Sequence, residues 1–428
     1  MEAHSALMLK ALSEAEPSFG IPHWRDTANL IKSYQDETGI TLTKPQRKAI
    51  WMGTRNSLMV LAGYAGSGKT TVLRGVCSAL EATGVEPIII TLSARAAKRA
   101  AEATGRPAQT VARFLVENTS NYDQTELDLE PKAVIVDEAS MLGAVEMWRV
   151  LKALNGASLI LCGDPAQLPP VNAGIVFHAL VKDEAIPRVI LDRVHRQDER
   201  TGIPALAEGV RDGILNTLPP FTGAESVGVT FNKTDRDVVS QTILDYGKQL
   251  RDLGADRDDV QIIAPTNREI EAINTFFHTL RCEADPILWP HHGDIAEGEP
   301  IIWTTNNHDR GLTNGSMGRI LEIGETHILA EIDGEHHTLD VEDRQSIELA
   351  YAISVHKAQG SQWRKVIIPI FQSRVVDRSL IYTALTRAQD QVLFVGDANA
   401  LNVAVAALPS AEKRRIGFVD WFDIARQR

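Results

Sequence analysis

Apolar and polar positions follow two patterns along the chain. Short, continuously apolar runs alternate with longer stretches in which apolar residues recur at helical spacing. Continuous apolar runs are typical of parallel strands covered on both faces, so the alternation predicts an α/β fold with parallel sheets. Between about 41 and 200 the expected strands are Leu58–Ala62, Pro87–Thr91, Ala133–Val136, Leu159–Cys162 and Val189–Leu191.

A second α/β set follows the first. A strand is expected at Val260–Ala264 and a helix at Arg268–Leu280, and the strand, helix and strand pattern then recurs at Lys365–Ile370, Leu380–Ala388 and Gln391–Val395. Between these pieces, glycines are frequent among short β-type runs. That change of character predicts a small antiparallel β-barrel inserted into the second domain.

The chain has 428 residues, more than a single typical domain. We expect a helical lead-in, a first α/β domain with a small insertion, and a second α/β domain interrupted by the barrel. The corresponding ranges are 1–40 for the lead-in, 41–200 for the first domain with its insertion at about 104–131, 201–284 and 349–428 for the second domain, and 285–348 for the barrel.

Composition narrows the classes of protein. The net charge of −12 argues against a protein that coats nucleic acid through overall positive charge, although it leaves room for a local basic groove. Cys77, Cys162 and Cys282 lack metal-ligand spacing, which fits a reducing cytoplasm. No apolar run approaches the ~20 residues of a membrane span, and Met1–Pro17 lacks the apolar core of a signal peptide. We expect a cytoplasmic protein, in a bacterial cell or, if phage-encoded, in its host.

The segment Gly63–Thr70 reads G-x-x-G-x-G-K-T and satisfies the P-loop pattern. An apolar strand precedes it and a helical pattern follows, which is the context the motif needs. Glycines let the backbone N–H groups surround phosphate oxygens, and the helix N-terminus adds a positive dipole end. Lys69 is expected to reach the β- and γ-phosphates and Thr70 to bind Mg²⁺. The expected ATP contacts are Gly63, Ala65, Gly66, Ser67, Gly68, Lys69, Thr70 and Thr71.

An apolar strand that ends in two carboxylates lies downstream, in Val134–Ser140. An acid at the carboxyl end of a strand beside a P-loop can hold Mg²⁺, a role that suits Asp137. Glu138 points elsewhere and can activate the attacking water. The alternative is an acidic turn with no catalytic role, which the upstream P-loop makes the weaker interpretation.

Further candidates for catalysis lie in a proline-rich loop and in two arginine-containing segments. Gly163–Pro170 places Gln167 where it could sense the γ-phosphate, although a plain proline-rich turn explains the loop equally well. Phosphoryl transfer also needs positive charge over the γ-phosphate, for which Arg196 and Arg387 are candidates. The alternative for either arginine is a solvated surface charge.

Taken together and in order, these motifs resemble those of superfamily 1 helicases, in the branch that includes RecD-like proteins and the phage Dda helicase. The resemblance covers about residues 40–400. The segments that carry it are Leu42–Arg47, Gly63–Thr70, Val136–Ser140, Gly163–Pro170, Val194–Gln197, Ile263–Asn267, Gly311–Gly318, Ala352–Ser361 and Tyr382–Ala388.

The resemblance implies two RecA-like P-loop domains, with an SH3-like insert in the second, that bind ATP and Mg²⁺. Gln46 would contact adenine, and Gly360, Arg387 and Arg196 would meet the γ-phosphate. Hydroxyl, amide and basic side chains would hold single-stranded DNA by its backbone, without reading its sequence. By the resemblance, these DNA contacts are Thr91, Ser93, Arg95, Gln109, Thr110, Thr266, Asn267, Ser354, His356 and Lys357.

The implied activity is an ATP-dependent DNA helicase that moves 5′ to 3′ on single-stranded DNA and unwinds duplexes in replication, recombination or repair. A translocase that does not separate strands is the runner-up, and a P-loop small-molecule kinase is a distant alternative. Expected partners are single-stranded DNA, duplex junctions, and single-strand-binding or replication proteins, with the chain functional as a monomer. The strand-splitting pin of the family would fall at Asn118–Leu129, which holds little apolar material. The lack of a long extra N-terminal domain favours the compact, stand-alone Dda type.

Overall fold

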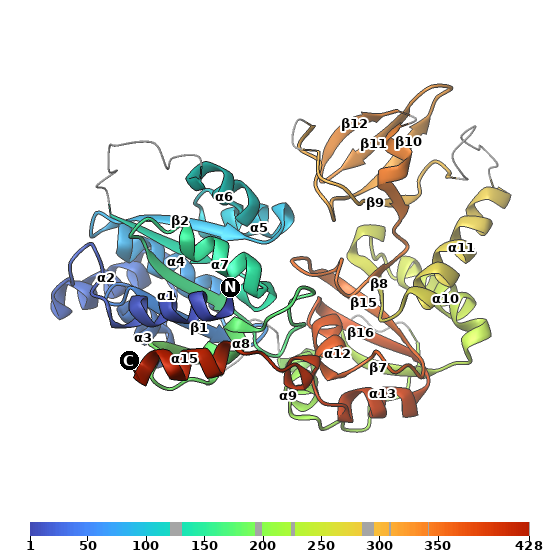
Figure 1. Ribbon diagram of the computed structural model, residues 1–428. Helices are drawn as coiled ribbons and strands as arrows, with labels where there is room; N and C mark the ends of the chain where they lie inside the picture. Colours follow the sequence, from blue (N-terminus) through green and yellow to red (C-terminus); the bar gives the residue numbers. More distant parts are fainter. Residues whose placement is uncertain are drawn as a thin grey trace. The chain divides into compact units, whose positions relative to one another are not determined.

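The computed structural model describes residues 1–119, 131–192, 199–223, 227–284, 295–307, 310–340 and 342–427. They form two compact units (Figure 1). Unit 1 comprises Met1–Arg196 and Pro409–Arg428, and unit 2 comprises Gln197–Leu408. The chain therefore passes from one unit to the other twice.

Unit 1 is built on a six-stranded parallel sheet with the order β3-β2-β4-β5-β1-β6. Five of its strands coincide with those expected from the apolar runs, and β3 is the additional one. The strands are β1 (Leu58–Gly63), β2 (Glu86–Thr91), β3 (Ala108–Thr110), β4 (Lys132–Val136), β5 (Ser158–Gly163) and β6 (Arg188–Leu191).

The two faces of this sheet carry separate hydrophobic cores. Successive strand residues point to opposite faces, so Leu58 and Val60 enter one core while Met59 and Leu61 enter the other. The first core packs against α1 (Glu2–Glu14), α6 (Val111–Thr119), α7 (Ala144–Lys152), α8 (Val176–Lys182) and α15 (Phe418–Gln427). The second packs against α2 (Trp24–Thr38), α3 (Lys44–Gly53), α4 (Lys69–Glu81) and α5 (Ala94–Thr104). Cover on both faces explains why the strands are apolar without alternation.

The C-terminal segment belongs to unit 1, so the assignment of 409–428 to the second domain is wrong. After the short helix α14 (Ser410–Lys413), α15 lies against α1. Phe418 and Phe422 stack with their ring centroids 5.5 Å apart and are buried in the unit 1 core. The Arg426 guanidinium pairs with Asp183 at 2.6 Å. Burial of this helical stripe stabilises the return of the chain to unit 1.

The expected insertion at 104–131 also needs correction. Ala108–Thr110 is strand β3 of the main sheet, paired in parallel with β2, and α6 follows it directly. Residues 108–119 are therefore part of the α/β domain itself. Most of the predicted pin at Asn118–Leu129 lies outside the described residues.

Unit 2 contains a five-stranded parallel sheet with the order β14-β8-β15-β16-β7. Its strands are β7 (Gly228–Lys233), β8 (Val260–Ala264), β14 (Ala352–Ser354), β15 (Trp363–Ile370) and β16 (Ala388–Gly396). Its helices are α9 (Ile203–Asp212), α10 (Val239–Asp252), α11 (Asn267–Ala284), α12 (Arg378–Leu385) and α13 (Ala398–Ala406). The expected second parallel sheet is confirmed.

A five-stranded antiparallel sheet is inserted between α11 and β14, as the glycine-rich region predicted (Figure 1). Its order is β12-β11-β10-β9-β13, and its own core includes Trp303, Ile320 and Ile328. The strands are β9 (Pro300–Trp303), β10 (Met317–Ile323), β11 (Ile328–Ile332), β12 (Glu335–Leu339) and β13 (Ile347–Leu349). Closure of this insert into an SH3-like barrel remains a prediction. In the part of the chain that the structure describes, no helix has the length and apolarity to cross a membrane.

His178 on α8 is a buried imidazole in the unit 1 core. Among the described residues neither of its ring nitrogens has a hydrogen-bond partner. Burial, with smaller contributions from the positive charges of Lys182 and Arg414, lowers the pKa of His178 to about 4. The folded state therefore disfavours the charged imidazole, which the unfolded chain accepts below its usual pKa of about 6.5.

Acidification should consequently destabilise unit 1. The unfolded state binds the additional proton, so the stabilising contribution is present above about pH 6.5 and is lost as the pH falls toward 4. Between pH 7 and pH 5 we expect a loss of about 2 kcal/mol from His178 alone. Urea unfolding at the two pH values measures the free energy of unfolding. Hydrogen exchange of peptides from α8 shows which transition belongs to unit 1. His178→Leu should flatten this pH dependence, and an equally steep dependence in that variant would contradict the assignment.

Candidate nucleotide site and nucleic-acid interface

The P-loop joins the carboxyl end of β1 to the first turn of α4. Gly66 and Gly68 have φ angles of +78° and +84°, a region that favours glycine. A Cβ atom at Gly63 would lie 2.6 Å from Ser67 Oγ, so glycine is also needed there for close packing. The sequence therefore folds this loop tightly ahead of the amino end of α4, which suits the binding of an anion.

Lys69 and Gln46 both contact this loop. Lys69 Nζ donates hydrogen bonds to the carbonyl oxygens of Gly63 (2.7 Å) and Tyr64 (3.2 Å). Gln46 completes a capping box with Thr43 at the start of α3, and its Nε2 donates to the Ser67 carbonyl at 3.3 Å. The structure thus brings Gln46, the predicted adenine contact, onto the phosphate loop itself.

The acidic pair lies at the carboxyl end of β4, as the sequence predicted. Burial and the charge of Glu138 raise the pKa of Asp137 to about 6, although a hydrogen bond from the Glu138 N–H and the charge of Lys69 act in the opposite direction. A carboxylate in this position would be stabilised by a bound dication. Together with the Thr70 hydroxyl it offers the oxygen ligands that Mg²⁺ prefers, so the residues fit that ion.

Glu138 carries two features that structural residues rarely combine. Its backbone is left-handed, with φ at 56°, which is uncommon for a residue other than glycine. Its Oε2 atom is buried and has no hydrogen-bond partner among the described residues. Strained backbone and an unpartnered buried carboxylate oxygen both cost free energy, and both are typical of functional sites.

The remaining candidates for the nucleotide site lie on several elements. Gln167 is buried in the loop that follows β5 in unit 1. In unit 2, Arg387 is 3% exposed and donates to the carbonyl oxygens of Thr383 (3.1 Å) and Ser361 (3.4 Å). The second of these bonds brings Arg387 next to Gly360, whose φ is +76°. Arg196 lies outside the described residues.

The structure gathers the predicted DNA contacts of unit 1 at the carboxyl ends of β2 and β3, where Thr91 pairs with Thr110. Their hydroxyls also have local structural roles. Thr91 Oγ1 donates to the Ser93 carbonyl at 2.8 Å, and Ser93 Oγ caps α5 by accepting from the Ala96 N–H. The remaining members are Gln109 on β3 and Arg95 in the first turn of α5.

The predicted DNA contacts of unit 2 follow two neighbouring strands, because β14 pairs with β8. Ser354 Oγ accepts a hydrogen bond from the Lys357 N–H, and Lys357 Nζ pairs with Glu348 of the insert at 2.7 Å. His356 is exposed. After β8, the Thr266 hydroxyl donates to Glu269, and Asn267 opens α11 and is exposed.

One contact to the nucleotide site comes from the segment that the sequence marked only as a lead-in. The Tyr34 hydroxyl on α2 donates to the Thr71 carbonyl at 3.0 Å, in the first turn after the P-loop. Ile31 and Tyr34 form a buried pair at helical spacing, which was the available signal for packing of α2 against α4.

Comparisons with known proteins agree with this arrangement. Residues 41–219 match a family model described as an AAA domain, and residues 349–395 match one described as a UvrD-like helicase C-terminal domain. The ATP-dependent RecD2 DNA helicase of Deinococcus radiodurans is 30% identical over 372 residues, covering 85% of this chain and 50% of that protein. The RecBCD enzyme subunit RecD of Mycobacterium tuberculosis strain H37Rv is 29% identical over 455 residues, covering 93% and 75%.

Solved structures give the fold. A Bacteroides Pif1 helicase in complex with ADP-AlF3 and ssDNA superposes with a TM-score of 0.54 at 18% identity, covering 91% of this chain and 98% of that one. A Pif1 structure determined for DNA unwinding at forked dsDNA gives a TM-score of 0.55, also at 18% identity and covering 91% and 98%. The chain spans half the length of RecD2. The predicted recognition is confirmed: on its motifs, its two parallel sheets and its relatives, the chain belongs to the superfamily 1 helicases of the RecD type, and its fold is similar to that of the Pif1 helicases.

Proposed function

We propose that this chain is an ATP-dependent DNA helicase that translocates 5′ to 3′ on single-stranded DNA and separates duplexes. The observation that carries the proposal is the Asp137–Glu138 pair beside the P-loop, with its buried, unpartnered Glu138 oxygen. A module that only bound nucleotide would have no use for such a carboxylate. The names of the relatives RecD2 and RecD, and the single-stranded DNA in a Pif1 complex of the same fold, support DNA as the polymer.

Each candidate residue of the nucleotide site would have a separate role in ATP hydrolysis. Thr70 and Asp137 would hold Mg²⁺, which neutralises charge on the phosphates when bound. Lys69 would turn from the loop carbonyls to the β- and γ-phosphates. Glu138 would accept a proton from the attacking water, with Gln167 near the γ-phosphate. Arg387, and Arg196 by the family resemblance, would add positive charge as the γ-phosphate leaves.

The polynucleotide would be held by its backbone in each unit. The candidate contacts gather at the carboxyl ends of adjacent parallel strands, β2 with β3 and β8 with β14. Edges of this kind are where open α/β sheets bind ligands. The side chains there are hydroxyls, amides and a few cations, which suit phosphate contacts without base recognition.

The first test is ATP turnover with and without single-stranded oligothymidylate. We expect strong stimulation with little dependence on base sequence. Affinity should fall with salt with a log–log slope of about −0.7 for each neutralised phosphate. ATP turnover that the strand does not stimulate, as expected of a small-molecule kinase, would overturn the proposal.

Forked duplexes with either a 5′ or a 3′ tail then test strand separation and direction. Unwinding from the 5′ tail alone supports the proposal. Efficient unwinding from the 3′ tail would overturn the proposed direction and leave the ATPase assignment intact. Stimulated ATP turnover without unwinding from either tail would favour the alternative, a translocase or remodeller on single strands. The same assays with single-strand-binding or replication proteins, and sedimentation of the active chain, test the proposed partners and the monomeric state.

A further inference from the structure

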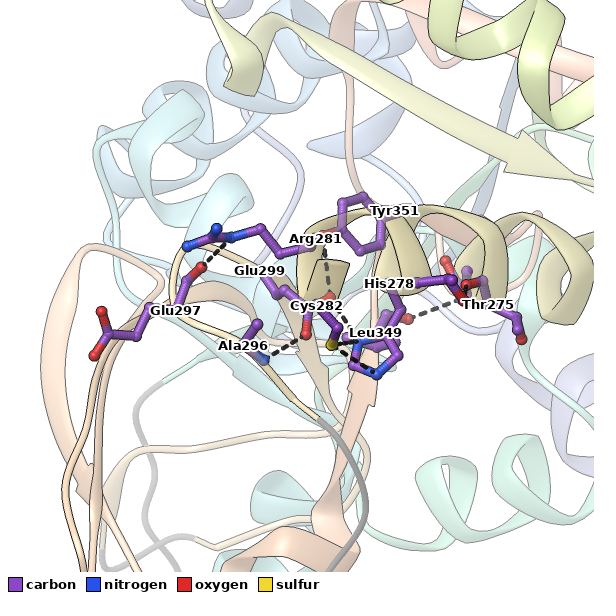
Figure 2. A network of polar contacts seen from close by, with 11 residues as sticks. Thr275, His278, Arg281, Cys282, Ala296, Glu297, Glu299, Leu349 and Tyr351 are labelled. Atoms are coloured by element: carbon purple, nitrogen blue, oxygen red, sulfur yellow. Dashed lines mark hydrogen bonds and ion pairs between the residues drawn. The ribbon is translucent and has the colours of Figure 1, made fainter. Parts of the chain in front are cut away.

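Glu299 is a buried carboxylate in unit 2 that the proposed chemistry does not use. It lies just before β9 and is 0% exposed. A buried charge is costly unless partners satisfy it, and Glu299 has three (Figure 2). It accepts a hydrogen bond from the Ala296 N–H at 2.8 Å, its Oε1 lies 2.9 Å from His278 Nδ1, and the same oxygen lies 3.1 Å from the Tyr351 hydroxyl.

These three partners come from different parts of unit 2. His278 lies on α11 of the parallel-sheet domain, and Ala296 lies in the segment that leads into the antiparallel insert. Tyr351 lies in the two-residue connection between β13 of the insert and β14 of the parallel sheet. Glu299 therefore joins the insert, the parallel-sheet domain and the connection between them at one point.

Hydrogen bonds and a ring contact from α11 also anchor the connection between β13 and β14. Asn274 on α11 bonds the carbonyl oxygens of Leu349 (3.0 Å) and Ala352 (3.1 Å) and accepts from the Ala352 N–H (2.8 Å). The Tyr351 ring stacks on Phe277, with centroids 5.2 Å apart. Such anchoring matters because β14 is an edge strand, paired with β8 over only three residues.

The end of β14 and the segment that follows it carry four of the predicted functional residues. Ser354, His356 and Lys357 are candidate strand contacts, and Gly360 is a candidate γ-phosphate contact beside Arg387. A second link joins this segment to the insert, because Lys357 pairs with Glu348 of β13. A shift of β14 would therefore move these three candidate strand contacts together.

We propose that Glu299 is a positioning residue, which acts through Tyr351 to hold β14 and the segment up to Lys357 in the arrangement that a bound strand needs to activate ATP hydrolysis. The inference rests on the proposed function. It also separates two rates. Turnover without a strand depends on Lys69 and Glu138 in unit 1, whereas stimulation by the strand depends on the Glu299–Tyr351 contact in unit 2.

The test removes the Tyr351 hydroxyl and keeps the ring. Tyr351→Phe deletes the 3.1 Å contact to Glu299 while its ring can still stack on Phe277. Tyr246→Phe is the matched control, because it deletes a buried tyrosine hydroxyl on α10 of the same unit, remote in sequence from the insert. ATP turnover is measured against the concentration of single-stranded oligothymidylate, together with the melting temperature of each variant.

We expect Tyr351→Phe to keep the turnover measured without a strand. The oligothymidylate concentration for half-maximal stimulation should rise about tenfold, the factor that corresponds to loss of one hydrogen bond to a charged group. Tyr246→Phe should stimulate as the wild type does. Hydrogen exchange in peptides spanning 352–360 should increase in Tyr351→Phe and stay unchanged in the control, which a general loss of stability would not produce.

A second variant tests the carboxylate itself. Glu299→Gln keeps the size of the side chain but replaces one carboxylate oxygen by an NH₂ group. In one orientation of the amide, this NH₂ faces the Ala296 N–H, so that two donors meet. In the other orientation, the NH₂ faces His278 and Tyr351. The loss in Glu299→Gln combined with Tyr351→Phe should equal that of the more impaired single variant, because both act through one contact. Additive losses, or wild-type stimulation in Tyr351→Phe, would overturn the inference alone. A wild-type chain that the strand does not stimulate would overturn the proposed function and this inference with it.

Discussion

Glu138→Gln should bind ATP and yet lose its hydrolysis by ~100-fold or more, the scale expected for removal of a general base. The substitution replaces the carboxylate by an amide of the same shape, which cannot accept the proton of the attacking water. Lys69 and the glycine loop stay in place, so nucleotide affinity should change little. Steady-state phosphate release and the equilibrium binding of a fluorescent ATP analogue measure the two quantities separately.

Two comparisons make this result specific. Lys69→Ala should weaken nucleotide binding and also abolish turnover, because its ammonium would contact the phosphates directly. Glu146→Gln neutralises another carboxylate of unit 1, on α7, where its Oε1 accepts a hydrogen bond from Asn172 at 2.7 Å. That control should hydrolyse ATP at the wild-type rate. If Glu138→Gln also did so, the general-base role of Glu138 would be wrong.

Local patterns were sufficient to predict most of the sheet architecture. The strands β1, β4 and β5 are continuous apolar runs. Such a strand has apolar side chains on both faces, so it is stable only where both faces of the sheet are covered. The P-loop and the acidic pair are likewise local, since their chemistry depends on adjacent residues at fixed spacing. The positions of Lys69 at the start of α4 and of Asp137 and Glu138 just after β4 followed from that spacing.

Features that depend on distant partners were not predictable in the same way. Phe418 and Phe422 show helical spacing, but spacing does not say which of two α/β units a helix covers. The three-residue β3 is only half-buried and polar, so it gave no apolar signal. Glu299 is one of several acids in a glycine-rich segment, where a solvated position is the normal expectation. Its burial depends on His278 and Tyr351, which are 21 and 52 residues away.

Arg387→Ala should lower kcat for ATP by about 10³-fold and change ATP affinity far less. Its guanidinium would neutralise charge that develops on the γ-phosphate in the transition state, so the contact strengthens as the reaction proceeds. In the structure this guanidinium is buried and bonds the carbonyl oxygens of Thr383 and Ser361, so its removal could also disturb the local fold. The experiment must separate these two effects.

Arg378 provides the matched control. It lies on the preceding helix, α12, and also donates to backbone carbonyl oxygens, including that of Ala407 at 3.0 Å. Arg378→Ala should therefore cost stability without the loss of kcat. Steady-state kinetics of both variants, with their melting temperatures, measure the difference. Combining Arg387→Ala with Arg196→Ala should cost less than the two separate losses together, if both arginines stabilise one transition state. A change confined to KM in Arg387→Ala would instead assign Arg387 to ground-state binding, and an equal loss of kcat in Arg378→Ala would reduce its role to a structural one.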